Sequence, residues 1–300
     1  MTDTTQPGVT IDVATPYTLD DAVDLITDEL RPHTPLAGGT WIMRAPLRGE
    51  DFAHRYADLG AVGSLTEIDW HEGGLRIGAM VTHDGLGRIV ASVPQLRGLA
   101  TAALTSANPG VRNIATIGGN IAATQFRCPD VTTALLSLRA NVNIRTHSSR
   151  DAKLIPLHAF LESPSGGRHL ITGAEFPLPS GPSAHLRLPL RAAGDYPAVI
   201  CSVSTEVGRD GRMASATISY GALSGRPMRW RALEAAVNVH GFDPEFAERE
   251  ARVLAPALTA SDSPGVPADY RRGVLPSLIG RAFADCHSQM KGAPWFTTSS

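Results

Sequence analysis

Two glycine pairs constrain this chain most, because each follows a short apolar run and is predicted to form a turn. The first lies in residues 36–40 (Leu-Ala-Gly-Gly-Thr) and the second in residues 116–120 (Thr-Ile-Gly-Gly-Asn). Glycine accepts positive φ angles and lets backbone N–H groups converge on an anion with no Cβ in the way. One such pair is common in ordinary turns, but two in one chain suit the two phosphates of a dinucleotide.

The better-known nucleotide motifs do not occur in this sequence. It contains no GxGxxG between a strand and a helix, so we do not expect a Rossmann site for FAD or NAD. It also contains no GxxxxGK followed by Ser or Thr, which excludes a P-loop. A dinucleotide would therefore have to be held by the two glycine pairs in a different arrangement.

Charge and cysteine usage exclude several functions. The chain has 27 Lys and Arg against 29 Asp and Glu, a formal net charge of −2, so it shows no electrostatic signature of nucleic-acid or anionic-membrane binding. Its three cysteines, Cys128, Cys201 and Cys286, are widely spaced, which argues against a disulfide scaffold, a zinc site or an Fe–S cluster in this chain. The ten histidines show no metal-binding spacing either.

The same features predict a cytoplasmic protein. Scarce cysteine suits a reducing compartment. Residues 1–13 are polar and do not read as a secretory signal, and the longest apolar runs are too short to cross a bilayer.

Hydrophobic spacing predicts a mixed α+β chain in two parts. Three hundred residues fit two domains, and the Pro-Ser-Gly-Pro run within residues 178–182 is the best linker. Before it, a helix should start after Thr18 and end at Pro32, and a hairpin should turn at Gly73-Gly74. The other predicted elements are helices over 96–104, 130–138, 230–239, 244–254 and 270–290, and a hairpin formed by strands 198–207 and 214–223.

With these motifs in place, the chain resembles the FAD-binding medium subunit of molybdenum hydroxylases, the family of carbon monoxide, xanthine and nicotine dehydrogenases. The most specific match is residues 112–122 (RNIATIGGNIA), which contain the second glycine pair. The resemblance covers most of the chain, and its other motifs are residues 36–40, 77–82 (IGAMVT), 190–196 (LRAAGDY), 269–272 (DYRR) and 281–282.

The resemblance implies a fold and a function. Residues 1–178 would form a two-part FAD-binding domain of the vanillyl-alcohol-oxidase-like type, built from two small α/β subdomains. Residues 183–292 would form a three-stranded antiparallel sheet with a helical bundle. The chain would carry non-covalent FAD and pass electrons to an external acceptor, with no catalytic residue and no metal of its own. The molybdopterin and [2Fe-2S] clusters would belong to a large and a small partner subunit of a hetero-oligomer.

The resemblance also implies which residues hold FAD. The two glycine segments would wrap the pyrophosphate, Asp130 would bind a flavin-side hydroxyl, Ile171 would pack on the isoalloxazine, and Arg187 would supply the basic residue that opens the second domain. The full set is Leu36, Ala37, Gly38, Gly39, Thr40, Trp41, Thr116, Ile117, Gly118, Gly119, Asn120, Asp130, Ile171 and Arg187.

The sequence departs from the family pattern at four places. Trp41 stands where a smaller polar residue is usual, and the segment from Gln125 to Asp130 is about one residue longer. An aromatic residue and a lysine are common where His185 and Arg187 stand. In addition, Ser106 lies where some members place an aromatic ring over one flavin face, which implies a more open face here.

Simpler interpretations of the same residues stay open from the sequence. Asp130 could be the N-cap of the following helix, Ile171 an ordinary core residue, and Cys128 a buried thiol with no bond to flavin. Two other functions also stay open: a free-standing flavin oxidoreductase of related fold, and a binding module that lacks flavin. The first would need a substrate-pocket acid or a covalent flavin ligand, and the second would be colourless.

Overall fold

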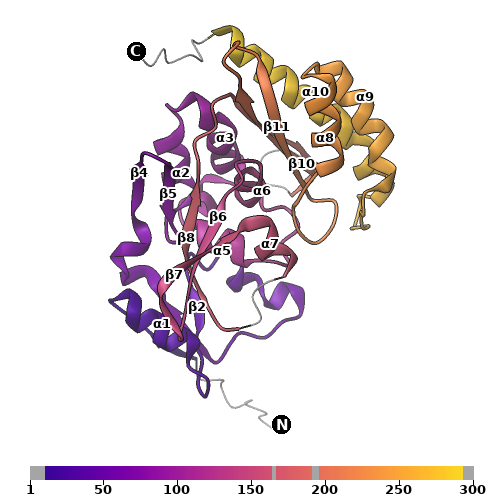
Figure 1. Ribbon diagram of the computed structural model, residues 1–300. Coiled ribbons are helices and arrows are strands. Elements are labelled where there is room, and N and C mark those ends of the chain that lie inside the picture. The colour runs from indigo at the N-terminus through magenta and orange to yellow at the C-terminus, as the bar shows by residue number, and fades with distance from the viewer. Residues whose placement is uncertain (1–10, 164–166, 191–195, 293–300) are drawn as a thin grey trace, which may run out of the picture.

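A computed structural model describes residues 11–163, 167–190 and 196–292 (Figure 1). The first ten residues, examined above for a signal sequence, lie outside this range, as do residues 191–195 of the motif at 190–196. Among the described residues, no helix combines the length and apolar character needed to cross a membrane.

The N-terminal part begins with a small parallel sheet. Its strand order is β1 (Asp12–Ala14), β3 (Arg55–Asp58), β2 (Thr34–Leu36). Helix α1 (Leu19–Thr27) connects β1 to β2 along the sequence. Thr18 caps α1 as predicted, because its Oγ1 accepts from the backbone N–H of Asp21 at 3.1 Å. The helix ends five residues before the predicted Pro32, since the Asp28 carboxylate accepts from the next backbone N–H groups and turns the chain.

A five-stranded antiparallel sheet follows, in the order β4 (Ile68–His71), β5 (Gly74–Gly78), β8 (Leu170–Phe176), β6 (Asn141–Thr146), β7 (Ser149–Pro156). The predicted hairpin at Gly73-Gly74 is confirmed as the β4–β5 connection. The helices of this part are α2 (His83–Val90), α3 (Arg97–Thr105), α4 (Pro109–Arg112), α5 (Ile117–Ala122), α6 (Asp130–Ser137) and α7 (Leu157–Glu162).

The C-terminal part contains a second antiparallel sheet and three helices. The sheet order is β12 (Met228–Arg229), β11 (Met213–Gly221), β10 (Pro197–Val207), β9 (Ser183–Pro189), and the helices are α8 (Arg231–His240), α9 (Pro244–Leu254) and α10 (Ala268–Gly292). The expected α+β class is confirmed, but the sheet has four strands rather than three. The extra strand has two residues, too few to show a periodicity in the sequence.

The central strand of this sheet has two different faces, because successive side chains point to opposite sides. Val199, Cys201 and Val203 join the apolar core that α8 and α10 complete. Ser202 points to the other side, where Ser219 of β11 donates a hydrogen bond from Oγ to the Thr133 carbonyl of α6 at 2.7 Å. Figure 1 shows the sheet between the two sets of helices, so its polar face joins the two parts of the chain.

The motif at residues 269–272 has a structural role in this arrangement. Arg271 of α10 is buried, and its guanidinium donates to the Ala198 and Ala222 carbonyls. These bonds tie the last helix to the beginning of β10 and the end of β11.

Candidate functional site

The first glycine pair lies in the loop that leaves β2. Gly39 has φ +69°, a left-handed conformation that favours glycine. Its carbonyl accepts from the Met43 N–H, and a short 3-10 helix over Ile42–Arg44 follows the loop. Gly38 has ordinary φ, but a Cβ there would lie 1.6 Å from the Ile114 carbonyl oxygen. Close approach of two backbones therefore requires glycine at position 38.

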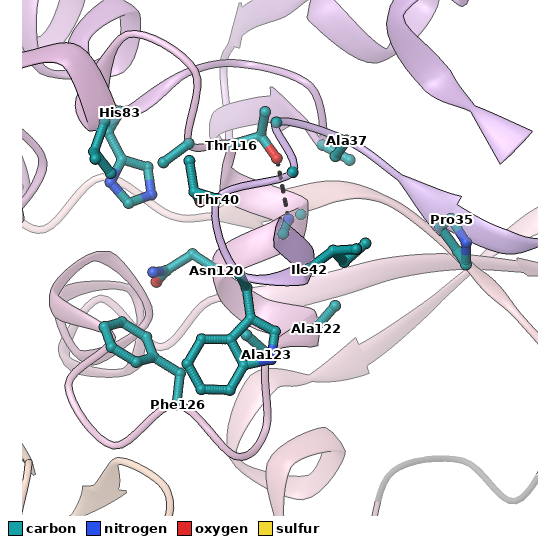
Figure 2. A pocket seen from close by; sticks show the side chains of 18 of the residues that line it. Pro35, Ala37, Thr40, Ile42, His83, Thr116, Asn120, Ala122, Ala123 and Phe126 are labelled. Atoms are coloured by element: carbon teal, nitrogen blue, oxygen red, sulfur yellow. Dashed lines mark hydrogen bonds between the residues drawn. The ribbon is translucent and has the colours of Figure 1, made fainter. Parts of the chain in front are cut away.

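The second glycine pair is not a tight turn, and the expectation of a turn there is wrong. It forms the first turn of α5, where Thr116 is the N-cap and its Oγ1 accepts from the Gly119 N–H at 3.2 Å (Figure 2). A strong cap overcomes the poor helix propensity of two glycines. Neither glycine has positive φ; a Cβ at Gly118 would lie 2.7 Å from that of Ala79, so close packing explains this glycine.

The two glycine segments meet at one cavity of about 540 Å³, a size usual for small-molecule sites. Figure 2 shows Ala37 and Thr40 of the first segment beside Thr116 and Asn120 of the second. Of the predicted site residues, those that line the cavity are Ala37, Gly38, Gly39, Thr40, Trp41, Thr116, Gly118, Gly119, Asn120, Asp130 and Ile171.

Three predicted residues do not line the cavity. Leu36 ends strand β2, and Ile117 is fully buried in the N-terminal core. Arg187 lies behind the cavity wall, where its Nε is 3.5 Å from Asp130 Oδ1 and its guanidinium donates to the Thr105 carbonyl.

Asp130 is the most unusual polar residue of the cavity wall. It is the first residue of α6 and only 1% exposed, and its Oδ1 accepts from His185 Nε2 at 3.1 Å. Its other oxygen, Oδ2, is buried and has no hydrogen-bond partner among the residues that the structure describes. The N-cap of α6 is Pro129 rather than Asp130, so capping does not account for this carboxylate. A buried acceptor without a donor costs free energy, which a ligand hydroxyl or N–H would offset.

Two of the departures from the family pattern pack against each other. The rings of Trp41 and Phe126 lie 5.4 Å apart, and Phe126 in turn meets Tyr196 edge-on at the same distance. The guanidinium carbon of Arg48 lies over the Trp41 ring, 3.9 Å from the ring centroid. The longer segment at Gln125–Asp130 thus places an aromatic ring on the enlarged side chain at position 41, and all three rings line the cavity.

His83 is a cavity residue that the sequence interpretation missed. It directly follows the motif at residues 77–82, which was the available signal. Its Nδ1 lies 2.9 Å from Ser106 Oγ, and both residues line the cavity. Burial, the largest cause, lowers the pKa of His83 to about 4; Asp130 and the Thr116 carbonyl oppose this shift, and Arg112 adds to it.

This depressed pKa predicts an acid-sensitive fold. Between pH 6.5 and about 4, the imidazole of His83 is protonated in the unfolded chain but stays neutral in the folded chain. The free energy of unfolding therefore falls as the pH is lowered through this range, by up to about 3 kcal/mol. Urea unfolding of the flavin-free chain at several pH values should show this loss, and His83→Asn should show a shallower pH dependence. Identical pH slopes for the two proteins would contradict the assignment.

Cys128 also lines the cavity but is not a reactive thiol. Burial, with a smaller contribution from Asp130, raises its pKa to about 12. It stays protonated at neutral pH, and a thiol in this state is a poor nucleophile. Cys128 is therefore a poor candidate for a covalent bond to a ligand in this cavity.

Comparison with known proteins gives two family matches that together cover most of the chain. Residues 9–179 match the FAD binding domain in molybdopterin dehydrogenase, and residues 184–286 match the CO dehydrogenase flavoprotein C-terminal domain. The chain is 27% identical to the xanthine dehydrogenase FAD-binding subunit of Escherichia coli O157:H7 over 225 residues, which are 72% of this chain and 75% of that one.

A second relative and a solved structure cover nearly the whole chain. The nicotine 6-hydroxylase medium subunit of Paenarthrobacter nicotinovorans is 27% identical over 277 residues, 91% of this chain and 95% of that one. A chain of reconstituted CO dehydrogenase from Oligotropha carboxidovorans superposes with a TM-score of 0.83 at 25% identity, covering 94% of this chain and 99% of that one.

Proposed function

Because this chain belongs to the family of FAD-binding medium subunits of molybdenum hydroxylases, we propose that it binds one FAD without a covalent bond and relays electrons through it. The observation that carries this function is the convergence of both glycine segments on one cavity whose wall includes the buried, unpartnered Asp130 Oδ2. When bound, FAD supplies a centre that takes up electrons singly or in pairs.

The wall chemistry suits the two kinds of polar group in FAD. Phosphate oxygens only accept hydrogen bonds, and the glycine segments bring backbone to the cavity with no side chain between. Ribityl hydroxyls and the flavin imide N–H donate, and Asp130 Oδ2 is an acceptor that lacks a donor. Ile171, buried at the cavity wall, would pack its aliphatic side chain on the isoalloxazine.

We assign no catalytic residue to this chain. Electron transfer through a bound flavin needs no acid or base from the protein, whose part is to anchor the cofactor and exclude water. Its three cysteines are free and buried, so they provide no ligand set for Fe–S clusters. Electrons would therefore come from a small [2Fe-2S] subunit, and the substrate would react at a large molybdopterin subunit, in a cytoplasmic hetero-oligomer.

We also propose that residues 1–178 form the FAD-binding domain and residues 183–292 the second domain. Two separate hydrophobic cores support this division. One extends from Ala22 to Phe176 and the other from Ala184 to Cys286.

The isolated chain tests the relay function. We expect it to be yellow, to be bleached by dithionite, and to show no flavin reduction with purines, N-heterocycles or carbon monoxide, because the substrate site lies in a partner. Anaerobic absorbance spectra with each compound provide the measurement. Substrate-dependent reduction without any added subunit would overturn the relay and support a free-standing flavin oxidoreductase, whereas a colourless chain that binds no FAD would support a flavin-free binding module.

Asp130 provides a second test. Asp130→Asn keeps the shape of the side chain but removes the charge, so FAD should bind about 1–3 kcal/mol more weakly, roughly 5–150-fold in dissociation constant. The matched control is Ser219→Ala, which breaks another bond between α6 and the C-terminal sheet but does not line the cavity. That control should change stability without changing FAD affinity, and an unchanged dissociation constant in Asp130→Asn would reject the ligand role.

A further inference from the structure

The proposed FAD ligand Asp130 is held from across the boundary between the two parts of the chain. Asp130 begins α6 in the N-terminal part, and His185 lies in β9 of the C-terminal part. Their side chains are 1% and 0% exposed, and His185 Nε2 lies 3.1 Å from Asp130 Oδ1. His185 itself does not line the cavity.

The orientation of the His185 ring is fixed from its other side. Ser202 lies directly opposite His185 in the β9–β10 register, and its Oγ is 2.7 Å from His185 Nδ1. Because the Asp130 carboxylate only accepts, Nε2 donates to it, and in the neutral imidazole Nδ1 then accepts from the Ser202 hydroxyl. The hydrogen bonds therefore run in one direction, from the Ser202 hydroxyl to His185 and from His185 to Asp130.

The same contacts decide which carboxylate oxygen remains for a ligand. Oδ1 accepts from His185 and lies 3.5 Å from the Arg187 guanidinium, whereas Oδ2 is buried without a partner in the described part of the chain. Turning the carboxylate out of its plane would break the contacts of Oδ1 with His185 and Arg187. From this geometry we infer that His185, oriented by Ser202, is a positioning residue that directs Asp130 Oδ2 toward a donor group of bound FAD. This inference rests on the proposed function.

The positioning role explains why histidine, rather than another aromatic residue, suits position 185. An aromatic hydrocarbon ring at that position has no N–H to donate to a carboxylate, whereas histidine has one on the required side. The His185–Ser202 pair also couples the C-terminal sheet to the proposed cofactor site, because its two members lie in strands β9 and β10.

Three substitutions of His185 test the positioning role. Glutamine places an amide N–H near the position of Nε2 and can still donate to Asp130, whereas asparagine reaches only the position of Nδ1, and phenylalanine donates nothing. We expect FAD to bind roughly tenfold more weakly to His185→Asn and His185→Phe, and within about threefold of wild type to His185→Gln. Ser202→Ala, which frees the ring, should have an intermediate dissociation constant.

A double-mutant cycle separates positioning from general destabilisation. FAD dissociation constants are measured by flavin fluorescence for His185→Asn, Asp130→Asn and the double variant, and thermal melts of the flavin-free proteins confirm folding. The double variant should bind FAD no more weakly than Asp130→Asn alone, while combining His185→Asn with the control Ser219→Ala should multiply the separate effects.

Three results would overturn the inference. These are wild-type affinity in His185→Asn, equal losses in the Gln, Asn and Phe variants that follow their melting temperatures, and independent effects of His185→Asn and Asp130→Asn. In each case the wild-type chain still binds FAD, so the proposed function stands. Failure of the wild-type chain to bind FAD would instead overturn the proposed function.

Discussion

Replacing Gly38 by alanine should cost the protein both its FAD site and much of its stability. A Cβ at this position would lie 1.6 Å from the Ile114 carbonyl oxygen. No side-chain rotation can relieve this overlap, because the backbone fixes the positions of both atoms. The loop after β2 and the segment before Thr116 would have to separate, which opens the cavity wall between the two glycine pairs. We expect a loss of about 3 kcal/mol or more in the free energy of unfolding.

Urea unfolding of the flavin-free variant and FAD titration measure the two effects. Gly63→Ala is the matched control, because Gly63 is exposed, lacks positive φ, and has no atom within 4 Å of an added Cβ. The control should resemble wild type in both measurements. Wild-type stability and FAD affinity in Gly38→Ala would show that the two segments do not meet as described.

Gly119→Val should weaken FAD binding strongly while leaving the fold nearly intact. Gly119 lines the cavity, and an added Cβ would have only Thr116 Oγ1 nearby, at 3.0 Å. In the proposed site, the branches of valine would extend into cavity space that bound FAD would fill. Valine is no worse than glycine in a helix, so the free energy of unfolding should change by less than about 1 kcal/mol.

The expected loss of FAD affinity is on the order of 100-fold, or about 2.8 kcal/mol. It is measured as the flavin-to-protein absorbance ratio after purification and as a dissociation constant. Gly119→Ala, with a smaller side chain, should show a smaller loss. Wild-type flavin occupancy in Gly119→Val would remove the second glycine segment from the site.

The sequence predicts the local parts of this structure well, because caps, turns and hydrophobic periods act over a few residues. The helix over residues 130–138 is confirmed as Asp130–Ser137, and the hairpin around residues 208–211 is confirmed by the β10–β11 pairing. The second glycine pair, predicted to be a turn, lies in a helix, because the Thr116 cap outweighs the poor helix propensity of glycine.

The contacts that build the site are less predictable, because they join residues far apart in the sequence. His185 and Asp130 are 55 residues apart, and nothing local to either position indicates that they pair. Likewise, Trp41 and Phe126 are each unusual alone, and only the fold shows that they pack together. The sequence therefore predicts which residues gather at the cavity better than it predicts which of them hold one another.

Titration of the flavin-free chain with FAD, followed by flavin fluorescence, tests the central claim most directly. We expect saturation at one FAD per chain, and release of all the flavin when the protein is denatured, because the proposed site holds FAD without a covalent bond and Cys128, the cysteine that lines it, stays a protonated thiol. A chain that binds no FAD, or one that keeps flavin attached after denaturation, would contradict it.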